Sequence, residues 1–535
     1  MALVLSELKL PLQADESSLK EFAARALAMP ESAILGLRVN RVSLDARRKD
    51  EICFSYTVTL TLSAKDEARA LRRTGVCVAR APEETPRVLS FGTEALNAPI
   101  VVVGMGPAGL FAAYLLAQNG YRPIVLESGR DVDARRADVA RFWEKGLFSE
   151  VSNAVFGEGG AGTFSDGKLT TRIKDPRAQE VVSVFAEHGA PEEIRSMAKP
   201  HIGTDKLVQV VKNMRLAILR MGGEVRFETR LTGLERNGDA LSAVHVESNA
   251  GRERIPCAAC ILAIGHGASD TYRMLAESGI LMQAKPFAAG VRIEHPREMI
   301  DKSQFGAFAG HPRLGAAEYH LADQSGGRGV YTFCMCPGGY VVACASEQGG
   351  VVTNGMSHYA RDGENSNAAV VVQVDARDFG ADDPLAGLRF REALERAAFR
   401  LGGGGFVAPA AQVGDYLSGR ASRGFGSVRP TYTPGVCPAD VAACLPDFMA
   451  AGVRDGIRAF GRRLHGFDMP EAVITAVESR TSAPVRILRG ETGEASGVPG
   501  LYPAGEGAGY AGGIVSAAVD GMRAAERVMA RFARP

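Results

Sequence analysis

APIVVVGMGPAGLFAAYLLAQNGYRPIVLES, residues 98–128, is the stretch that decides the fold of this 535-residue chain. Its apolar run at 100–103 predicts a strand buried on both faces, as in a parallel sheet. Three glycines follow in the spacing GxGxxG, and the Ala-rich segment after them predicts a helix over 107–119. A second apolar run at 124–126 predicts another strand, which ends at an acid. The stretch therefore predicts a strand–helix–strand unit.

Each part of this unit has a physical role in holding a dinucleotide. Gly104 lets the chain turn tightly, Gly106 lets backbone N–H groups approach a pyrophosphate, and Gly109 lets helix and strand pack closely. The helix N-terminus attracts phosphate charge, and Glu127, about 20 residues beyond the glycines, is placed to accept hydrogen bonds from ribose hydroxyls. The motif does not separate NAD from FAD. The binding residues that it predicts are Gly104, Gly106, Pro107, Ala108, Gly109, Glu127 and Ser128.

The composition indicates a globular protein with a balanced charge. With 46% hydrophobic residues the chain can bury large cores, and 62 basic against 61 acidic residues give no global attraction to nucleic acid or anionic lipid. Nine cysteines without a regular framework favour a reducing compartment. The start of the chain lacks a signal-peptide pattern, and no long apolar run predicts a membrane span. We therefore expect a cytoplasmic protein without a DNA partner or a metal site.

The pattern of residues changes three times along the chain. Residues 1–95 alternate strand-like and helical patterns and predict a small ferredoxin-like α+β module, followed by a Pro-rich stretch that resembles a linker. Residues 96–280 alternate strands and helices, as a Rossmann-type α/β domain does. Strand-like runs separated by Gly, Pro and Asn then predict an inserted antiparallel-sheet domain over 281–465. Residues 466–535 are expected to return to the Rossmann-type domain.

A second glycine-rich stretch, LYPAGEGAGYAGGIVSAAVDG at 501–521, has an apolar run, a glycine cluster and a helical pattern in the same order. It lacks the close GxGxxG spacing and the second strand with its terminal acid, so it cannot be an independent dinucleotide unit. Here the sequence resembles the glutathione-reductase-like superfamily of FAD-dependent oxidoreductases, in which a C-terminal strand, acid and helix return to the first Rossmann domain. The resemblance implies that both glycine stretches hold one FAD.

The same resemblance assigns further cofactor contacts. It implies that Glu506, where the superfamily usually has Asp, holds a ribitol hydroxyl, and that the helix beginning near Gly513 faces the pyrimidine edge of the flavin. It also implies that ILAIG at 261–265 approaches the cofactor, while the Gly-rich stretch FGEGGAGTFSDGKL at 156–169 offers backbone N–H groups as a nest or forms only a flexible loop. The residues concerned are Gly159, Gly160, Ala161, Gly162, Thr163, Ala263, Gly265, Gly505, Glu506, Gly512, Gly513 and Ile514.

A closer resemblance links the chain to a group of bacterial FAD-dependent dehydrogenases that share a small N-terminal module. The stretches that carry it span nearly the whole chain: SLDARRKD, FGEGGAGTFSDGKL, GVRIEHP, VYTFCMCPGGYVV, VTNGMS, ESRTSAPVRI and PAGEGAGYAGGIVSAAVDG. The resemblance implies an FAD-dependent oxidoreductase that moves a hydride between flavin N5 and a small organic substrate. It does not identify that substrate. We expect no separate NAD(P) domain, so electrons would come from the substrate, from transient NAD(P)H or from an electron-transfer protein.

In the superfamily the inserted domain covers the flavin, so the catalytic candidates lie in that domain. Arg292 is a candidate anchor for an anion and His295 a candidate proton carrier, although a strand-edge ion pair and a hydrogen-bonded histidine explain them equally well. Cys334 and Cys336 are expected on one face of a strand. We favour packing thiols there, with a thiol beside the flavin, Cys336, as the alternative. Metal binding is disfavoured because the spacing is poor and a second pair is lacking.

Arg480 and Arg486, in ESRTSAPVRILRG, are candidates for gripping an FAD phosphate or a substrate carboxylate, or else for pairing with Glu478 and its neighbours. Two other functions stay open. The inserted sheet also resembles flavoproteins that saturate prenyl chains, which need a long apolar tunnel. The basic stretch at 36–50 admits a flavoprotein that modifies tRNA, although residues 1–95 carry 14 basic and 13 acidic residues, which is poor support for a phosphate-binding face.

Overall fold

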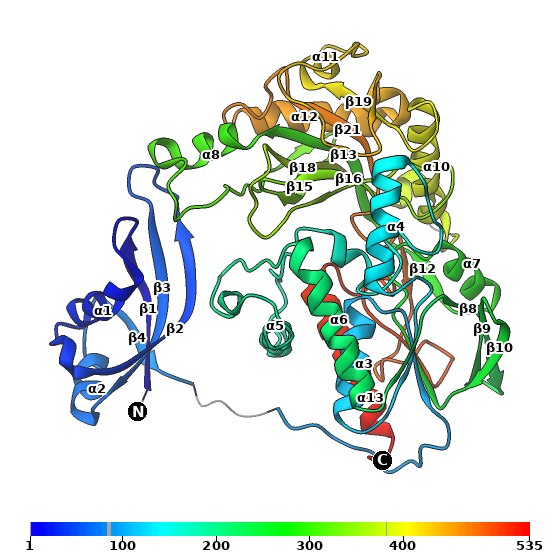
Figure 1. The fold of residues 1–535 in the computed structure, drawn as a ribbon, viewed down its shortest axis with the longest axis horizontal. Coiled ribbons are helices and arrows are strands. Elements are labelled where there is room, and N and C mark those ends of the chain that lie inside the picture. Colours follow the sequence, from blue (N-terminus) through cyan, green and yellow to red (C-terminus); the bar gives the residue numbers. More distant parts are fainter. Residues whose placement is uncertain (1, 83–86, 381) are drawn as a thin grey trace.

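The computed structural model describes residues 2–82, 87–380 and 382–535. Figure 1 shows three parts: a small N-terminal module on one side, a parallel sheet with its helices below, and an antiparallel sheet with its helices above. Part of the predicted Pro-rich linker, residues 83–86, lies outside the described residues. Within the described ranges no helix combines the length and the hydrophobicity that crossing a bilayer requires.

The N-terminal module is a four-stranded antiparallel sheet in the order β2-β3-β1-β4, with two helices. Its chain runs β-α-β-β-α-β, which is the connectivity of the ferredoxin-like module expected from the sequence. The α1 helix buries leucine and alanine side chains at helical spacing against the sheet. The elements are β1 (Ala2–Pro11), α1 (Leu19–Leu27), β2 (Ile34–Asp45), β3 (Cys53–Leu62), α2 (Ala64–Leu71) and β4 (Cys77–Arg80).

The parallel sheet has the order β23-β11-β5-β6-β7, so the C-terminal strand pairs beside β11, next to the first glycine strand. The strands are β5 (Ile100–Val103), β6 (Ile124–Leu126), β7 (Glu224–Arg226), β11 (Ala259–Leu262) and β23 (Leu501–Pro503). This arrangement confirms the predicted strands at 100–103 and 124–126. It also confirms that the second glycine stretch returns to the first sheet.

Two different layers cover this sheet, because side chains of a strand alternate between its faces. Ile100 and Val102 pack against the helices, whereas Val101 and Val103 pack against a small antiparallel sheet. Figure 1 shows helices of this layer lying side by side. The helices are α3 (Pro107–Gln118), α5 (Arg177–Glu187), α6 (Thr204–Arg220) and α13 (Ile514–Arg531), and α4 (Val132–Lys145) lies between α3 and α5 in the chain. The small sheet is β8 (Thr229–Asn237), β9 (Ala240–Ser248) and β10 (Gly251–Pro256), followed by α7 (Ser269–Glu277).

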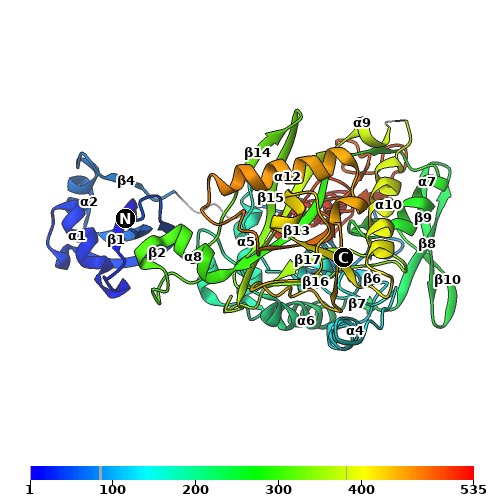
Figure 2. The same cartoon turned by 90° about the horizontal axis from the view of Figure 1, so that it is seen from above.

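The antiparallel cap sheet has the order β14-β15-β18-β13-β21-β19-β20, antiparallel except for the last pair. Figure 2 shows α12 lying across it. Its β21 strand (Val473–Glu478) pairs with β13, so the boundary expected between 465 and 466 does not separate the two sheets. The other elements are β13 (Phe287–Pro296), α8 (Arg297–Phe305), β14 (Ala322–Ser325), β15 (Arg328–Cys336), β18 (Asn365–Val374), α9 (Ala376–Phe379), α10 (Ala386–Leu401), β19 (Ala408–Gln412), α11 (Val413–Leu417), β20 (Val436–Pro438) and α12 (Asp447–Gly461).

Two short ribbons complete the upper part. β12 (Met282–Ala284) pairs with β22 (Val485–Ile487), and β16 (Tyr340–Ala343) pairs with β17 (Thr353–Met356). The β12–β22 ribbon lies in the two segments that connect the cap sheet with the parallel sheet, and the β16–β17 ribbon packs on the cap sheet. They bring the loops after β16 and β21 toward the carboxyl ends of the parallel strands, where the cavity described below lies.

Candidate functional site

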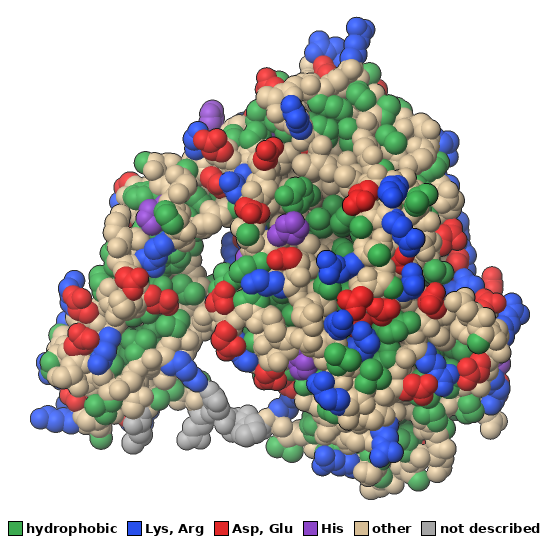
Figure 3. Space-filling model, viewed as in Figure 1, with side chains coloured by type: hydrophobic (Ala, Val, Ile, Leu, Met, Phe, Trp, Pro, Cys, Tyr) green, Lys and Arg blue, Asp and Glu red, His purple; other side chains and the backbone are tan. Residues whose placement is uncertain are grey.

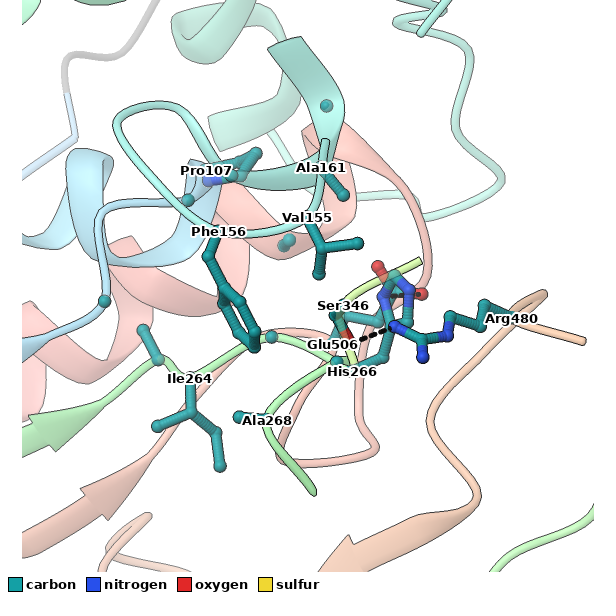
Figure 4. Close-up of a pocket in the computed structure, with 18 of the residues that line it drawn as sticks. Pro107, Val155, Phe156, Ala161, Ile264, His266, Ala268, Ser346, Arg480 and Glu506 are labelled. Atoms are coloured by element: carbon teal, nitrogen blue, oxygen red, sulfur yellow. Dashed lines mark hydrogen bonds and ion pairs between the residues drawn. The ribbon is translucent and has the colours of Figure 1, made fainter. Parts of the chain in front are cut away.

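A cavity of about 710 Å³ lies between the parallel sheet and the cap. The turns after β5, β11 and β23 all contribute to its wall, because carboxyl ends of parallel strands meet at one edge of a sheet. In Figure 4 side chains from the first glycine loop, from the loop of Phe156, from the turn after β11 and from the cap surround this space. The volume falls within the range of small-molecule and cofactor sites.

Two helix N-termini open into the cavity. The α3 helix has Gly106 as its N-cap and the α13 helix has Gly513, and no side chain in the described part of the chain caps either one. Both glycines line the cavity, together with Pro107 and Ile514, the first residues of the two helices. A helix N-terminus carries partial positive charge and unpaired N–H groups. The cavity is therefore suited to a ligand with negative charge at two separated places.

Close contacts at glycines pack the first glycine stretch onto itself, against the turn after β11 and against the second glycine stretch. A Cβ on Gly104 would stand 2.3 Å from the carbonyl oxygen of Ala263, and one on Gly109 would stand 1.8 Å from that of Gly104. A Cβ on Gly505 would stand 2.6 Å from the Cβ of Ala108. At Gly512 and Gly513, by contrast, an added Cβ would meet no atom of residues 2–82, 87–380 and 382–535 within 4 Å. Glycine thus permits backbone packing at some positions and leaves open space beside the cavity at others.

Glu127, the acid after β6, organises three loops. Its carboxylate accepts hydrogen bonds from the backbone N–H groups of Met105, Gly129 and Gly157, at 2.8, 2.8 and 3.0 Å. The side chain is buried, yet it forms part of the cavity wall. Glu127 therefore fixes the glycine loops relative to one another, in addition to the ribose contact that the sequence predicts.

The loop before α5 is shaped by a residue that sequence reasoning missed. Arg135 on α4 is fully buried and donates hydrogen bonds to four carbonyl oxygens, those of Asn153, Gly157, Glu158 and Gly160, at 2.7–3.2 Å. Because these carbonyls point toward Arg135, the loop is held through its acceptors as well as through N–H groups such as that of Gly157, which Glu127 binds. No sequence signal distinguishes Arg135 from its neighbours, since its acceptors are backbone atoms.

Glu506 lies on the cavity wall beside a histidine. Its Oε1 is 3.6 Å from Nδ1 of His266, in the turn after β11 (Figure 4). Asp520 on α13 fixes the turn after β23, which carries Glu506. It accepts a hydrogen bond from the N–H of Gly505 at 2.8 Å and pairs with Arg489. His266 and Asp520 were not predicted. Asp520 follows Gly505 by 15 residues, across a loop and the first turns of α13, a spacing without a motif.

Most of the predicted cofactor residues line the cavity, and a few support it from outside. Those on its wall are Gly104, Gly106, Pro107, Ala108, Glu127, Ser128, Gly160, Ala161, Gly162, Ala263, Gly265, Glu506, Gly512, Gly513 and Ile514. Those outside the wall are Gly109, Gly159, Thr163 and Gly505. Residues of the stretch at 156–169 form part of the cavity wall, and a segment of the stretch forms a short 3₁₀ helix at Gly160–Phe164.

The structure does not support catalytic roles for Arg292 and His295. Arg292 is fully buried and forms a bidentate pair with Glu478 at 2.9 Å, with a further bond to Asn367. His295 is also fully buried, bonds to the carbonyl oxygen of Phe467 through Nε2 at 2.7 Å, and lies outside the cavity wall. Burial lowers the pKa of His295 to about 4. These contacts favour the alternative given for both residues, an ion pair within the sheet and a hydrogen-bonded histidine.

Cys336 is not the cavity-facing thiol, and Cys334 takes that place. Cys336 is fully buried and lies outside the wall, whereas Cys334 is partly exposed and lines the cavity. A register shift follows Phe333, and Cys334 has a left-handed backbone with φ of 43°. This irregularity breaks the expected alternation, which placed both thiols on one face.

The two arginines near the C-terminus differ. Arg480 lines the cavity, but its guanidinium forms a bidentate pair with buried Glu395 at 2.8–2.9 Å and donates to Ser346. Arg486 lies outside the cavity wall, and its guanidinium is 5.2 Å from the ring of Tyr510. Arg480 therefore shapes the wall with its charge already balanced, and the phosphate role expected for Arg486 has no support from its position.

Comparison with known proteins identifies one close relative and two domain families. Residues 286–481 match the family described as FAD-dependent protein, C-terminal domain-like, and residues 3–61 match a domain of unknown function. An uncharacterized protein of Clostridium beijerinckii is 45% identical over 537 residues, which cover 100% of both chains.

Solved structures give weaker likenesses. A geranylgeranyl bacteriochlorophyll reductase-like protein from Thermoplasma acidophilum is 13% identical, covers 82% of this chain and 79% of its own, and has a TM-score of 0.35. CtdE in complex with FAD is 11% identical, covers 81% and 86%, and has a TM-score of 0.33. At these values no conclusion about substrate or reaction is drawn from either.

Proposed function

The chain belongs to the same family as the Clostridium beijerinckii relative and carries the FAD-dependent protein C-terminal domain, and from this premise we propose that it is an FAD-dependent oxidoreductase. It would transfer a hydride between flavin N5 and a small organic substrate. The observation that carries the proposal is the pair of glycine-capped, otherwise uncapped helix N-termini that open into one cavity.

The residues of the cavity fit FAD at several places. The α3 N-terminus and the open backbone at Gly106 would hold the pyrophosphate. Glu127 would accept from the adenosine ribose, Glu506 would accept from a ribitol hydroxyl, and the α13 N-terminus would face the pyrimidine edge. When bound, FAD supplies an acceptor or donor of two electrons. The positive end of α13 would then favour negative charge on the flavin, while the cap would exclude water.

The flavin would also have to exchange electrons with a donor or acceptor from outside the protein. The substrate, transient NAD(P)H and an electron-transfer protein are the candidates, and the reaction runs in whichever direction their potentials set. The cap side of the wall carries Lys168, Glu478 and Arg480. These charged groups favour a polar substrate over a prenyl chain, whose binding would require an apolar tunnel.

The tRNA alternative receives little support from the N-terminal module. Arg47 pairs with Asp45 and Arg48 pairs with Asp50 and Glu51, so these cations are balanced by their neighbours. Figure 3 shows basic and acidic side chains interspersed over the visible face of the molecule. A phosphate-binding surface needs a concentration of positive charge.

The test of the proposal is the colour of the purified protein. We expect it to be yellow and to release FAD on denaturation, and protein that is colourless and fails to bind added FAD would contradict the proposal. Gly106→Val should abolish binding, because its side chain would enter the cavity from a backbone that does not need glycine. Gly490→Val, an exposed position with equally open surroundings, is the matched control.

A further inference from the structure

Two thiols with no role in FAD binding lie at the cap side of the cavity. Cys334 lines the wall, and Cys336 lies directly behind it, fully buried, with its Sγ 3.4 Å from the carbonyl oxygen of Cys334. Gly355 leaves room for this arrangement, since a Cβ there would stand 2.9 Å from the Cys336 Sγ.

The backbone presents Cys334 to the cavity at a cost. A left-handed conformation is uncommon for residues other than glycine, and such strain is concentrated at functional sites. The register shift between Phe333 and Cys336 interrupts pairing with β18 at this point. Bulges next to active sites re-aim a side chain. Here the irregularity turns Cys334 toward the cavity while Cys336 stays in the core.

Charged groups around the pair favour a thiolate. The cations are Lys168, which lines the cavity, and Arg292, which donates to the carbonyl oxygen of Cys334 at 3.1 Å. Of the nearby anions, Glu478 is paired with Arg292, and Asp166 is paired with Arg361 and, at 3.8 Å, with Lys168. The pKa of Cys334 is lowered to about 6. The neighbouring Cys336 side chain lowers it most, Lys168 and Arg292 lower it further, and burial and Glu478 act in the opposite direction. Burial lowers the pKa of Lys168, whereas Asp166 and both thiols raise it, and the net shift is upward.

We propose that Cys334 and Cys336 form a redox-active dithiol that exchanges an electron pair with the flavin, an inference that rests on the proposed function. The reduced pair is one thiolate and one thiol. On oxidation the S–H bond of the thiol breaks and an S–S bond forms between the two Sγ atoms. Two electrons and one proton pass to the flavin, so that atoms and charge balance. The reverse step reduces the disulfide.

The pairing can be read from one tryptic peptide, residues 329–361, which contains Cys334, Cys336 and Cys344. Purified protein is oxidised with diamide, its remaining thiols are alkylated, and the peptide is weighed. We expect the wild type to lose two hydrogen atoms and to keep one alkylated thiol. Cys344→Ser, a buried thiol whose pKa burial raises to about 11, is the matched control and should still lose two hydrogens. Cys334→Ser and Cys336→Ser should not.

Two outcomes would overturn the dithiol. Either the wild-type peptide keeps all its hydrogens, or Cys336→Ser still forms a disulfide, which would pair Cys334 with Cys344. This readout does not need FAD. A colourless protein that closes the disulfide would therefore reject the proposed function separately from the dithiol, because each has its own measurement.

Electron counting tests the link to the flavin. In an anaerobic reductive titration of FAD-loaded protein after oxidation with diamide, we expect the wild type and Cys344→Ser to take up twice as many electrons as Cys334→Ser. Equal uptake in all three would show that the flavin and the thiols do not share electrons.

Lys168→Met should also raise the pH at which Cys334 is half alkylated, whereas Lys199→Met, an exposed lysine paired with Glu318, should not.

Discussion

Glu506 is the side chain that tests whether the C-terminal stretch holds the cofactor. It lies on the cavity wall beside His266, and a carboxylate bonded to a hydroxyl forms a charge-assisted hydrogen bond of about 1.5–3 kcal/mol. Glu506→Ala should therefore weaken FAD binding by roughly 10- to 150-fold. Titration of the apoprotein with FAD measures this, with Glu491→Ala, an exposed residue of a nearby loop, as control. Unchanged affinity would remove the ribitol contact from the proposal.

His295 sets a pH dependence of stability in the cap. Its folded pKa of about 4 lies below the ordinary value of 6.5, so the unfolded chain binds a proton first as the pH falls. The contribution of His295 to the free energy of unfolding is therefore fully present above about pH 6.5 and is lost as the pH falls toward 4. Between pH 7 and pH 5 the wild type should lose about 2 kcal/mol more than His295→Gln. Urea unfolding of both proteins at the two pH values measures the difference; parallel losses would show that His295 does not titrate as stated.

The sequence predicted the roles of residues that act locally, but it could not identify ion-pair partners that lie far away in the chain. The glycines of 104–109 act on the adjoining backbone, so their spacing was sufficient. Arg292 pairs with Glu478 and Arg480 pairs with Glu395, across 186 and 85 residues, and only the folded sheet brings these partners together. Periodicity also failed at Cys334, because a single left-handed residue reverses the side-chain alternation on which the prediction depended.

The packing of α3 against α13 joins the two glycine stretches into one site. Gly521, within α13, lies so close that an added Cβ would stand 2.0 Å from the carbonyl oxygen of Ala108, a backbone atom that cannot move freely. Intrinsic propensity favours Ala over Gly in a helix by about 1 kcal/mol. Gly521→Ala should nevertheless destabilise the protein by roughly 1–3 kcal/mol, because overpacking separates the helices.

Thermal unfolding with and without FAD measures this effect. Gly490→Ala is the matched control, since the added Cβ meets no atom within 4 Å there. We also expect Gly521→Ala to weaken FAD binding, as both helix N-termini would move apart. A variant as stable as the wild type, with unchanged affinity, would show that the contact between the helices does not position the cavity.

At the level of the elements, the sheet order was less predictable than the strands themselves. The runs at 100–103 and 501–503 indicated strands, and the resemblance placed both in one sheet. The β21 strand, however, lies beyond the expected boundary at 465 and yet pairs in the cap sheet. Its all-buried pattern fits either sheet, so hydrophobicity alone could not assign it.

Among the described residues, the N-terminal module contacts the rest of the molecule on two sides (Figure 1). On the cap side, Arg313 donates hydrogen bonds to the carbonyl oxygens of Leu12 (2.9 Å) and Ala14, and its guanidinium lies 4.7 Å from the centre of the Phe54 ring. On the other side, the backbone of Val42 exchanges hydrogen bonds with Ser196 and Ala198, at 2.7 and 2.8 Å. Figure 3 shows an opening between these two bodies.

Because both contacts must break when the module undocks, weakening one should be visible at the other. Arg313→Ala removes hydrogen bonds and a cation–π contact, together about 1–2 kcal/mol, so exchange of the Ala198 amide hydrogen should speed up by roughly 5- to 30-fold. Arg25→Ala, which removes an exposed pair with Glu21 inside the module, should leave this rate unchanged. FAD affinity should not change in either variant, since neither residue lines the cavity. If Ala198 exchanges at the wild-type rate in Arg313→Ala, the two contacts act independently and the module is not docked as one body.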